Sequence, residues 1–146
     1  MPVQQLNPVE WLAQADPEPE HAFNWWLQHP DEIAFIPAGR LFDAVKVGVA
    51  RAQRLRGTLV GRMAGPVYTN ADNATTYFLV PPGTAQTWPP STDAECIGEG
   101  QWLWVPVPTR IRRDHSYWEQ PPDGSGILHS PQVLLAALAA LREPEP

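Results

Sequence analysis

The sequence predicts an α+β fold: one domain with a small, mainly antiparallel sheet and flanking helices. A chain of 146 residues fits one domain, and 43% hydrophobic residues with seven Trp are enough to build a core. Eighteen Pro and ten Gly divide the chain into short elements, which argues against a long helical bundle. Short apolar, β-branched and aromatic runs lie between stretches with helical periodicity, so both kinds of element are expected.

The N-terminal part predicts two short helices. Asn7 can cap a helix that Pro8 begins, and residues 16–19 (Asp-Pro-Glu-Pro) end it. A second helix is expected at about 20–28, and its aromatic positions are His21, Phe23, Trp25 and Trp26. These rings either pack an N-terminal helical arm, residues 1–31, onto the core, or form a platform for base stacking or peptide binding.

Two strands are expected next, at residues 32–36 and 40–47, with a tight hairpin-like turn at Gly39. The period of two places Asp43 on one face of the second strand with Leu41, Val45 and Val47. Phe42, Ala44 and Lys46 lie on the other face. A carboxylate among apolar neighbours needs a partner, and either Arg40 or backbone amides could supply it. Asp43 is therefore the candidate catalytic residue, with a structural role as the alternative.

The middle of the chain predicts a helix and a strand pair. The helix runs from Gly48 to about Met63, and its apolar side consists of Val49, Ala52, Leu55, Leu59 and Val60. Residues 66–68 and 75–80 are expected to be strands joined by a turn at 70–73. Thr84 could cap a single helical turn toward Trp88, and residues 89–100 are expected to be an irregular loop carrying Cys96.

The last third predicts two further strands and a helix. Residues 101–105 are expected to form a strand that either lies at a sheet edge or ends at a site, because Pro residues follow it. A basic loop at 109–116 and a short strand at 117–119 come next, followed by a turn at 121–126. Ser130 caps a helix that runs from Pro131 to about Arg142. The domain proper is thus expected at 32–142, with a frayed tail at 143–146.

Charge is distributed unevenly along the chain, whose net charge is −6. Residues 1–39 contain six acids and no Lys or Arg, whereas residues 40–62 contain six basic residues against one acid. Nine of the ten bases are Arg, which suits planar partners such as phosphate. The candidate phosphate-binding or nucleic-acid-binding residues are Arg40, Arg51, Arg54, Arg110, Arg112 and Arg113. The candidate stacking residues are Trp102, Trp104 and Trp118. The alternative is a solvated surface neutralised by the acidic arm.

Other classes of site have little support in the sequence. A single cysteine excludes an intrachain disulfide, and Cys96 has no His or Asn paired with it locally as a nucleophile would require. The four His are scattered without metal-ligand spacing, so no zinc site and no cofactor are expected. The first residues lack the features of a signal peptide, and no apolar run reaches 18 residues. We therefore expect a cytoplasmic protein with no membrane partner.

Five segments carry a resemblance to a known family. They are Pro37-Ala-Gly-Arg-Leu-Phe-Asp43-Ala-Val-Lys-Val47, Gly65-Pro-Val67, Tyr77-Phe-Leu-Val-Pro-Pro-Gly-Thr-Ala85, Gly100-Gln-Trp-Leu-Trp-Val-Pro-Val-Pro-Thr109 and Tyr117-Trp-Glu-Gln-Pro-Pro122. In order and spacing, the chain from about Ile33 to Leu141 resembles the N-terminal domain of the bifunctional DNA primase/polymerase family, in particular its short actinobacterial form. The resemblance implies a primase/polymerase-like fold.

The resemblance also shows what the chain lacks. Working members carry two acids two residues apart for divalent metals, a His that contacts nucleotide phosphates, and a further acid on a later strand. Here Asp43 is followed by Val45, Thr75 and Thr76 stand where the His would be, and the only acid near the later strand is Glu99. Because polymerisation needs two metal ions about 4 Å apart, template-directed synthesis by this chain alone is not expected.

Three functional hypotheses follow from the sequence. The first is a non-catalytic, primase/polymerase-like domain that binds DNA or a nucleotide through the Arg patch. The second is a protein-interaction or regulatory domain that uses the aromatic arm and the acidic surface. The third is a remnant metal-dependent nucleotidyltransferase, the only case in which a divalent metal is expected.

Overall fold

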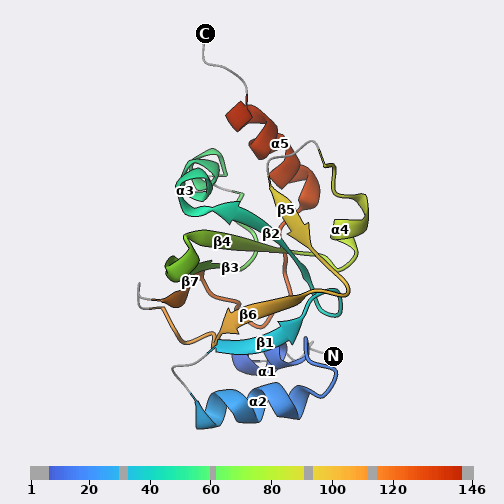
Figure 1. Ribbon diagram of the computed structural model, residues 1–146, viewed down its shortest axis with the longest axis vertical. Helices are drawn as coiled ribbons and strands as arrows, with labels where there is room; N and C mark the ends of the chain where they lie inside the picture. Colours follow the sequence, from blue (N-terminus) through green and yellow to red (C-terminus); the bar gives the residue numbers. More distant parts are fainter. Residues whose placement is uncertain (1–6, 30–32, 60–61, 91–93, 112–114, 143–146) are drawn as a thin grey trace.

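The computed structural model describes residues 7–29, 33–59, 62–90, 94–111 and 115–142, and it confirms the α+β class (Figure 1). The strands form two antiparallel sheets where one was expected. A two-stranded sheet pairs β1 (Ile33–Pro37) with β6 (Trp102–Pro106). A five-stranded sheet has the order β5-β2-β4-β3-β7. Its strands are β2 (Asp43–Gly48), β3 (Val67–Asn70), β4 (Thr75–Val80), β5 (Glu95–Ile97) and β7 (Ser116–Gln120).

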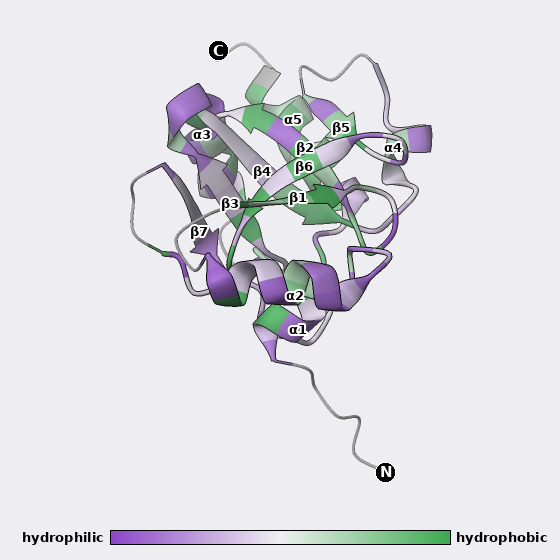
Figure 2. Ribbon diagram, turned by 60° about the horizontal axis from the view of Figure 1, so that its bottom comes forward, coloured by the Kyte–Doolittle hydropathy of each residue, from purple (hydrophilic) through white to green (hydrophobic). Residues whose placement is uncertain are grey.

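Helices cover both ends of this arrangement. They are α1 (Pro8–Ala13), α2 (Pro19–Gln28), α3 (Val49–Thr58), α4 (Thr84–Thr87) and α5 (Pro131–Arg142). In Figure 1, α1 and α2 lie next to the β1–β6 sheet, whereas α3 and α5 lie at the opposite end. Figure 2 shows hydrophobic residues along β1 and β2, with hydrophilic residues concentrated on α2 and α3. The helices thus turn polar residues outward and bury an apolar side.

Two apolar cores lie on the two faces of β2, as the period of two predicts. Phe42 and Ala44 belong to a core shared with α1, α2 and the β1–β6 sheet. Val45 and Val47 belong to a second core with α3 and α5. Because β2 is hydrogen-bonded to β4 on one side and to β5 on the other, its neighbours are fixed on all four sides.

The predicted β3–β4 hairpin is confirmed. Residues Ala71–Asn73 form a single 3₁₀ turn, and the Asn70 side chain accepts a hydrogen bond from the Asp72 amide. Ala74 adopts a left-handed conformation at the end of this turn. A short local connection with Asn and Asp residues is sufficient to specify this pair.

The predicted hairpin between β1 and β2 is wrong. The chain does turn at Gly39, whose φ is 95° and whose amide donates to the Phe42 carbonyl at 2.9 Å. A Cβ at Gly39 would lie 2.7 Å from the Glu99 Cα, so the turn needs glycine. The two strands nevertheless enter different sheets, and β2 begins at Asp43 rather than Arg40.

Three smaller expectations need correction. The region expected to be an irregular loop contains β5, in which Cys96 lies opposite Val45. The helix after β2 ends at Thr58 rather than Met63, after a last turn weakened by Gly57. Thr84 is the first residue of α4 rather than its cap, and its hydroxyl donates to the Pro81 carbonyl at 2.6 Å.

The two N-terminal helices are part of the folded body. Asn7 caps α1 as predicted, since its side chain accepts a hydrogen bond from the Glu10 amide at 2.8 Å. Trp11 stacks against Phe42 with ring centroids 6.0 Å apart, and Trp26 is buried. No helix among the described residues is long and apolar enough to cross a membrane.

Candidate functional site

Asp43, the candidate catalytic residue, is buried at the first position of β2 with 1% of its surface exposed. Its Oδ2 accepts a hydrogen bond from the Ala85 amide at 2.8 Å. Ala85 lies in the first turn of α4, whose own N-cap residue, Gly83, has no side chain to offer. The Asp43 carboxylate, which lies on β2, therefore caps the first turn of α4. Arg40, the other expected partner, donates to the Gln14 carbonyl instead, at 3.3 Å.

The surroundings of Asp43 disfavour its charged form. Burial raises the pKa of the Asp43 carboxyl, while the amides of Ala85 and Gly83 partly oppose that rise and the Glu99 charge adds to it. The second oxygen, Oδ1, is buried without a hydrogen-bond partner. Gly98 closes the site, because a Cβ there would lie 3.2 Å from Oδ2. Among the described residues, no group of three or more His, Cys, Asp or Glu is placed to hold a metal ion.

Cys96 lies beside this carboxylate on the edge strand β5 and is half-buried. Burial, followed by the charges of Asp43 and Glu95, raises the pKa of the Cys96 thiol to about 12. A thiol that stays protonated at neutral pH is a poor nucleophile. The position of Cys96 therefore favours a packing role over a catalytic one.

The structure does not bring the predicted Arg patch together, because Arg40 and Arg110 lie at opposite ends of the β1–β6 sheet. Arg40 follows the end of β1, which pairs with the start of β6 at Pro37 and Trp102. Arg110 follows the end of β6, which pairs with the start of β1. The two Arg residues thus lie at opposite ends of the β1–β6 sheet. Arg112 and Arg113 lie outside the described residues.

Arg51, Arg54 and Arg110 lie toward one end of the five-stranded sheet. The strand register aligns Gly48, Thr75, Asn70 and Ser116 in a row across four strands. α3, which carries Arg51 and Arg54, begins directly after Gly48. At the other end of the row, Arg110 Nε donates to the Ser116 carbonyl at 2.9 Å. Neighbouring strands are about 4.8 Å apart, so the row spans roughly 14 Å.

The predicted stacking residues differ in exposure. Trp118 is 1% exposed, and its indole N–H donates to the Pro106 carbonyl at 2.8 Å. Its ring is therefore not available for stacking on a ligand. Trp102 and Trp104 are 52% and 54% exposed. Both project from the outer face of β6, whose inner face carries the buried Leu103 and Val105.

Two further residues join these two Trp: Phe35, which was not predicted as a site residue, and Trp25, which was predicted only as part of an aromatic platform on the N-terminal arm. Phe35 is 47% exposed and lies between them, with ring centroids 4.9 Å from Trp102 and 4.4 Å from Trp104. Trp25, 39% exposed, extends the surface from α2, and its indole N–H donates to the Ile33 carbonyl of β1 at 3.1 Å. We call these four residues, Trp25, Phe35, Trp102 and Trp104, the aromatic face.

A groove of about 260 Å³ lies where α2 meets the aromatic face. Its lining consists of Asp16, His21, Ala22, Trp25, Ile33, Ala34, Phe35 and Trp104. The Asp16 carboxylate accepts a hydrogen bond from the Glu18 amide at 2.9 Å on Oδ1. Its Oδ2 lies 3.3 Å from the His21 ring nitrogen. The groove therefore combines aromatic rings with one carboxylate.

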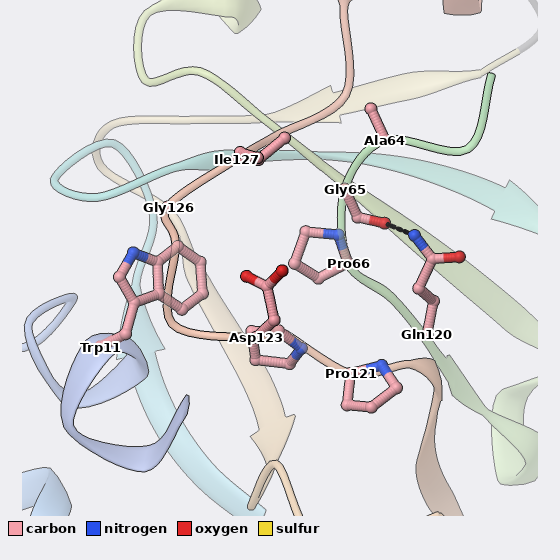
Figure 3. A pocket seen from close by; sticks show the side chains of 10 residues that line it. Trp11, Ala64, Gly65, Pro66, Gln120, Pro121, Asp123, Gly126 and Ile127 are labelled. Atoms are coloured by element: carbon pink, nitrogen blue, oxygen red, sulfur yellow. Dashed lines mark hydrogen bonds between the residues drawn. The ribbon is translucent and has the colours of Figure 1, made fainter. Parts of the chain in front are cut away.

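Other hollows lie elsewhere on the molecule. A cleft of about 590 Å³ between α1 and α2 is lined by Glu10, Ala13, Gln14, Pro19, Glu20, Phe23 and Asn24. Figure 3 shows a smaller pocket, of about 120 Å³, where Trp11 of α1 meets the chain around Pro66 and Asp123. There the Gln120 side chain donates to the Gly65 carbonyl at 2.6 Å and so holds the pocket wall together. This pocket is large enough for only a few water molecules.

No protein-family model, no curated protein and no solved structure matches the chain. The resemblance to the primase/polymerase family therefore stays a prediction. Among the described residues, the aromatic face is the largest exposed group of aromatic rings.

Proposed function

We propose that the protein is a non-catalytic binding domain that recognises a protein partner through its aromatic face. One observation carries the proposal: Phe35, Trp102 and Trp104 are each about half exposed and lie ring against ring. Large rings that gather on a surface are typical of interaction sites, where Trp is enriched among the residues that contribute most to binding. The opposite face of the same two strands is buried, so the sheet holds the rings in place.

The charges around the aromatic face favour a protein over a nucleic acid. The segment from α1 to α2 carries Glu10, Asp16, Glu18 and Glu20 and no Lys or Arg. A phosphate backbone brought to the aromatic face would approach these acids, and nucleic-acid binding depends on neutralising phosphates with cations. The exposed Arg54 follows β2 at the far end of the five-stranded sheet.

The environment of Asp43 supports the non-catalytic part of the proposal. Its Oδ2 is used to hold α4, and Gly98 packs directly over the carboxylate. A remnant nucleotidyltransferase would need this carboxylate to reach a bound metal ion. Primer extension with manganese tests that alternative. A remnant nucleotidyltransferase should extend the primer as wild type and lose that activity in Asp43→Ala.

Peptide selection followed by affinity measurement tests the proposed partner class. Peptides selected on the wild-type protein are expected to bind the double variant Trp102→Ser/Trp104→Ser at least about ten times more weakly, as loss of central aromatic contacts typically costs 2 kcal/mol or more. The matched control is Ile127→Ser, since Ile127 is similarly exposed but lies on the pocket of Figure 3. Equal affinity of wild type and the double Trp variant would refute the proposal.

Nucleic-acid binding is a second candidate, favoured by the positions of Arg51, Arg54 and Arg110 toward one end of the five-stranded sheet. It predicts a gel shift that fades with salt and with the change of Arg110, Arg112 and Arg113 to Ala. If single-stranded, double-stranded and primed DNA all fail to shift at low salt, this candidate is rejected.

A further inference from the structure

The groove between α2 and the aromatic face has the chemistry of a site for a cation. Its aromatic walls are Trp25, Phe35 and Trp104, and among the described residues of its lining Asp16 supplies the one carboxylate. Of those described lining residues none is Lys or Arg, and His21 is the only other titratable group. Aromatic faces attract cations through the quadrupole of the ring, and a carboxylate alongside adds a direct charge partner.

We infer that this groove receives an arginine side chain of the partner, so that the recognised segment is basic. The inference rests on the proposed function, since it names the chemistry of the partner that the aromatic face binds. Arginine fits better than lysine because its planar guanidinium stacks on an indole and donates two parallel hydrogen bonds to a carboxylate.

The Asp16 carboxylate has acceptor positions left for such a ligand. Each of its oxygens has one partner within the protein, the Glu18 amide on Oδ1 and the His21 ring on Oδ2. An ionised carboxylate offers about four lone-pair positions, so about two remain. The Glu18 amide lies just before α2 and fixes the orientation of the carboxylate.

The size of the groove also indicates a single side chain. At about 260 Å³ it is smaller than the roughly 300–1,000 Å³ that small-molecule sites occupy. The Trp25 indole is held against β1 by its hydrogen bond to the Ile33 carbonyl, so one wall is preformed. A preformed groove lowers the ordering cost that a ligand must overcome.

Charge complementarity extends beyond the groove. The described residues that line the larger cleft between α1 and α2 include Glu10 and Glu20 and no Lys or Arg. Arg40 reaches the end of α1, where it donates to the Gln14 carbonyl, but it lines neither hollow. Further basic residues next to the inserted arginine would therefore meet carboxylates rather than cations.

The test compares a five-residue peptide, acetyl-Gly-Ser-Arg-Ser-Gly-amide, with the same peptide carrying citrulline, a neutral analogue of arginine. Indole N–H signals of the full-length protein are followed by NMR during titration. We expect the arginine peptide to shift the Trp25 and Trp104 signals and to bind about ten times more tightly than the citrulline peptide, which corresponds to one charge-dependent contact. Equal affinities of the two peptides would overturn the inference.

Variants supply the second readout. Asp16→Asn keeps an acceptor for the Glu18 amide but removes the charge, so it is expected to bind the arginine peptide about ten times more weakly. Glu95→Gln removes an exposed acid of β5 in the five-stranded sheet, which lines neither the groove nor the cleft, and should change affinity less than about twofold. Unchanged affinity in Asp16→Asn would contradict the inference.

A leucine peptide of the same length separates this inference from the proposed function. If it shifts the signals of the aromatic face as strongly as the arginine peptide does, the face binds peptides but the inferred arginine specificity is wrong. Trp102 does not line the groove. If both the arginine peptide and the selected peptides bind Trp102→Ser as tightly as wild type while Asp16→Asn loses the arginine peptide, the groove is a cation site and the proposed role of the wider face is wrong.

Discussion

At the scale of single residues, Asp43 is a buried carboxylate that links two elements of the fold. The carboxylate joins the start of β2 to the first turn of α4 through the Ala85 amide. One oxygen is satisfied by that bond and the other is buried without a partner. The sequence showed that Asp43 needs a partner, but not which one, because Ala85 lies 42 residues further along the chain.

Two substitutions at Asp43 separate its hydrogen bond from its charge. Asp43→Asn keeps an acceptor for the Ala85 amide. It removes a buried carboxyl group whose pKa is raised by desolvation. It should therefore be as stable as wild type at pH 7, or more stable by up to about 1 kcal/mol. Asp43→Ala leaves the amide unpaired and should cost about 1–3 kcal/mol. Urea unfolding measures both, and an Asn variant as unstable as the Ala variant would contradict this role.

His129 makes the stability of the protein depend on pH. The ring is buried beside Phe78, with Nε2 3.2 Å from the Pro66 carbonyl. Burial lowers the pKa of His129 from 6.5 to about 4. Between these two pH values the unfolded chain binds the proton and the folded chain does not, so the free energy of unfolding decreases as the pH falls.

A non-titrating variant isolates this effect. The Gln side chain of His129→Gln can still donate to the Pro66 carbonyl. All other titratable groups are the same in both proteins, so the comparison isolates the titration of His129. The free energy of unfolding of wild type minus that of His129→Gln should decrease by about 3 kcal/mol between pH 7 and pH 4. This magnitude follows from the fall of the His129 pKa from 6.5 to about 4. The raised pKa of Asp43 acts in the opposite direction but is common to both proteins. A difference that stays constant with pH would show that the pKa of His129 is the same in the folded and the unfolded chain, and would contradict this prediction.

At the scale of elements, local contacts could be predicted from the sequence and distant ones could not. The β3–β4 hairpin and the caps of α1 and α5 depend on neighbouring residues: the Asp72 amide donates to the Asn70 side chain, and the Val133 amide donates to the Ser130 hydroxyl at 3.4 Å. The pairing of β1 with β6 and the addition of β5 to β2 join segments that are far apart in the chain. Period-two patterns assign faces within a strand but do not choose its partner.

Gly98 shows how such a distant contact constrains the chain. It lies where the connection after β5 crosses α4, and an added Cβ would lie 2.5 Å from the Ala85 Cβ. Gly98→Ala is therefore expected to reduce the free energy of unfolding by about 1–3 kcal/mol, as overpacking usually does. The measurement is urea unfolding at pH 7.

Gly57→Ala is the matched control for this substitution. Gly57 lies in the last turn of α3, and nothing lies within 4 Å of an added Cβ. Replacing a helical glycine by alanine should raise stability by about 0.5–1 kcal/mol. If Gly98→Ala stabilises the protein as much as Gly57→Ala does, the close approach to α4 is not a constraint.

At the scale of the whole molecule, the aromatic face forms because β1 pairs with β6, two strands that lie far apart in the sequence. Trp102 and Trp104 were expected to be candidates, and Trp118 belonged to the same group but packs inside against Tyr68. Phe35 could not be added from the sequence, because its strand is apolar on both faces and its partner strand was unknown. Trp25 joins the face through its hydrogen bond to β1.

The seven Trp of the chain give the most direct test of the proposed binding surface. Cross-saturation NMR with a selected, bound peptide reports which indole N–H groups lie next to the ligand. We expect transfer to Trp102, Trp104 and Trp25, and none to the buried Trp11 and Trp118. Transfer confined to amides of α3 and the loop at Arg110, with none to Trp102 and Trp104, would place the binding surface elsewhere and contradict the central claim.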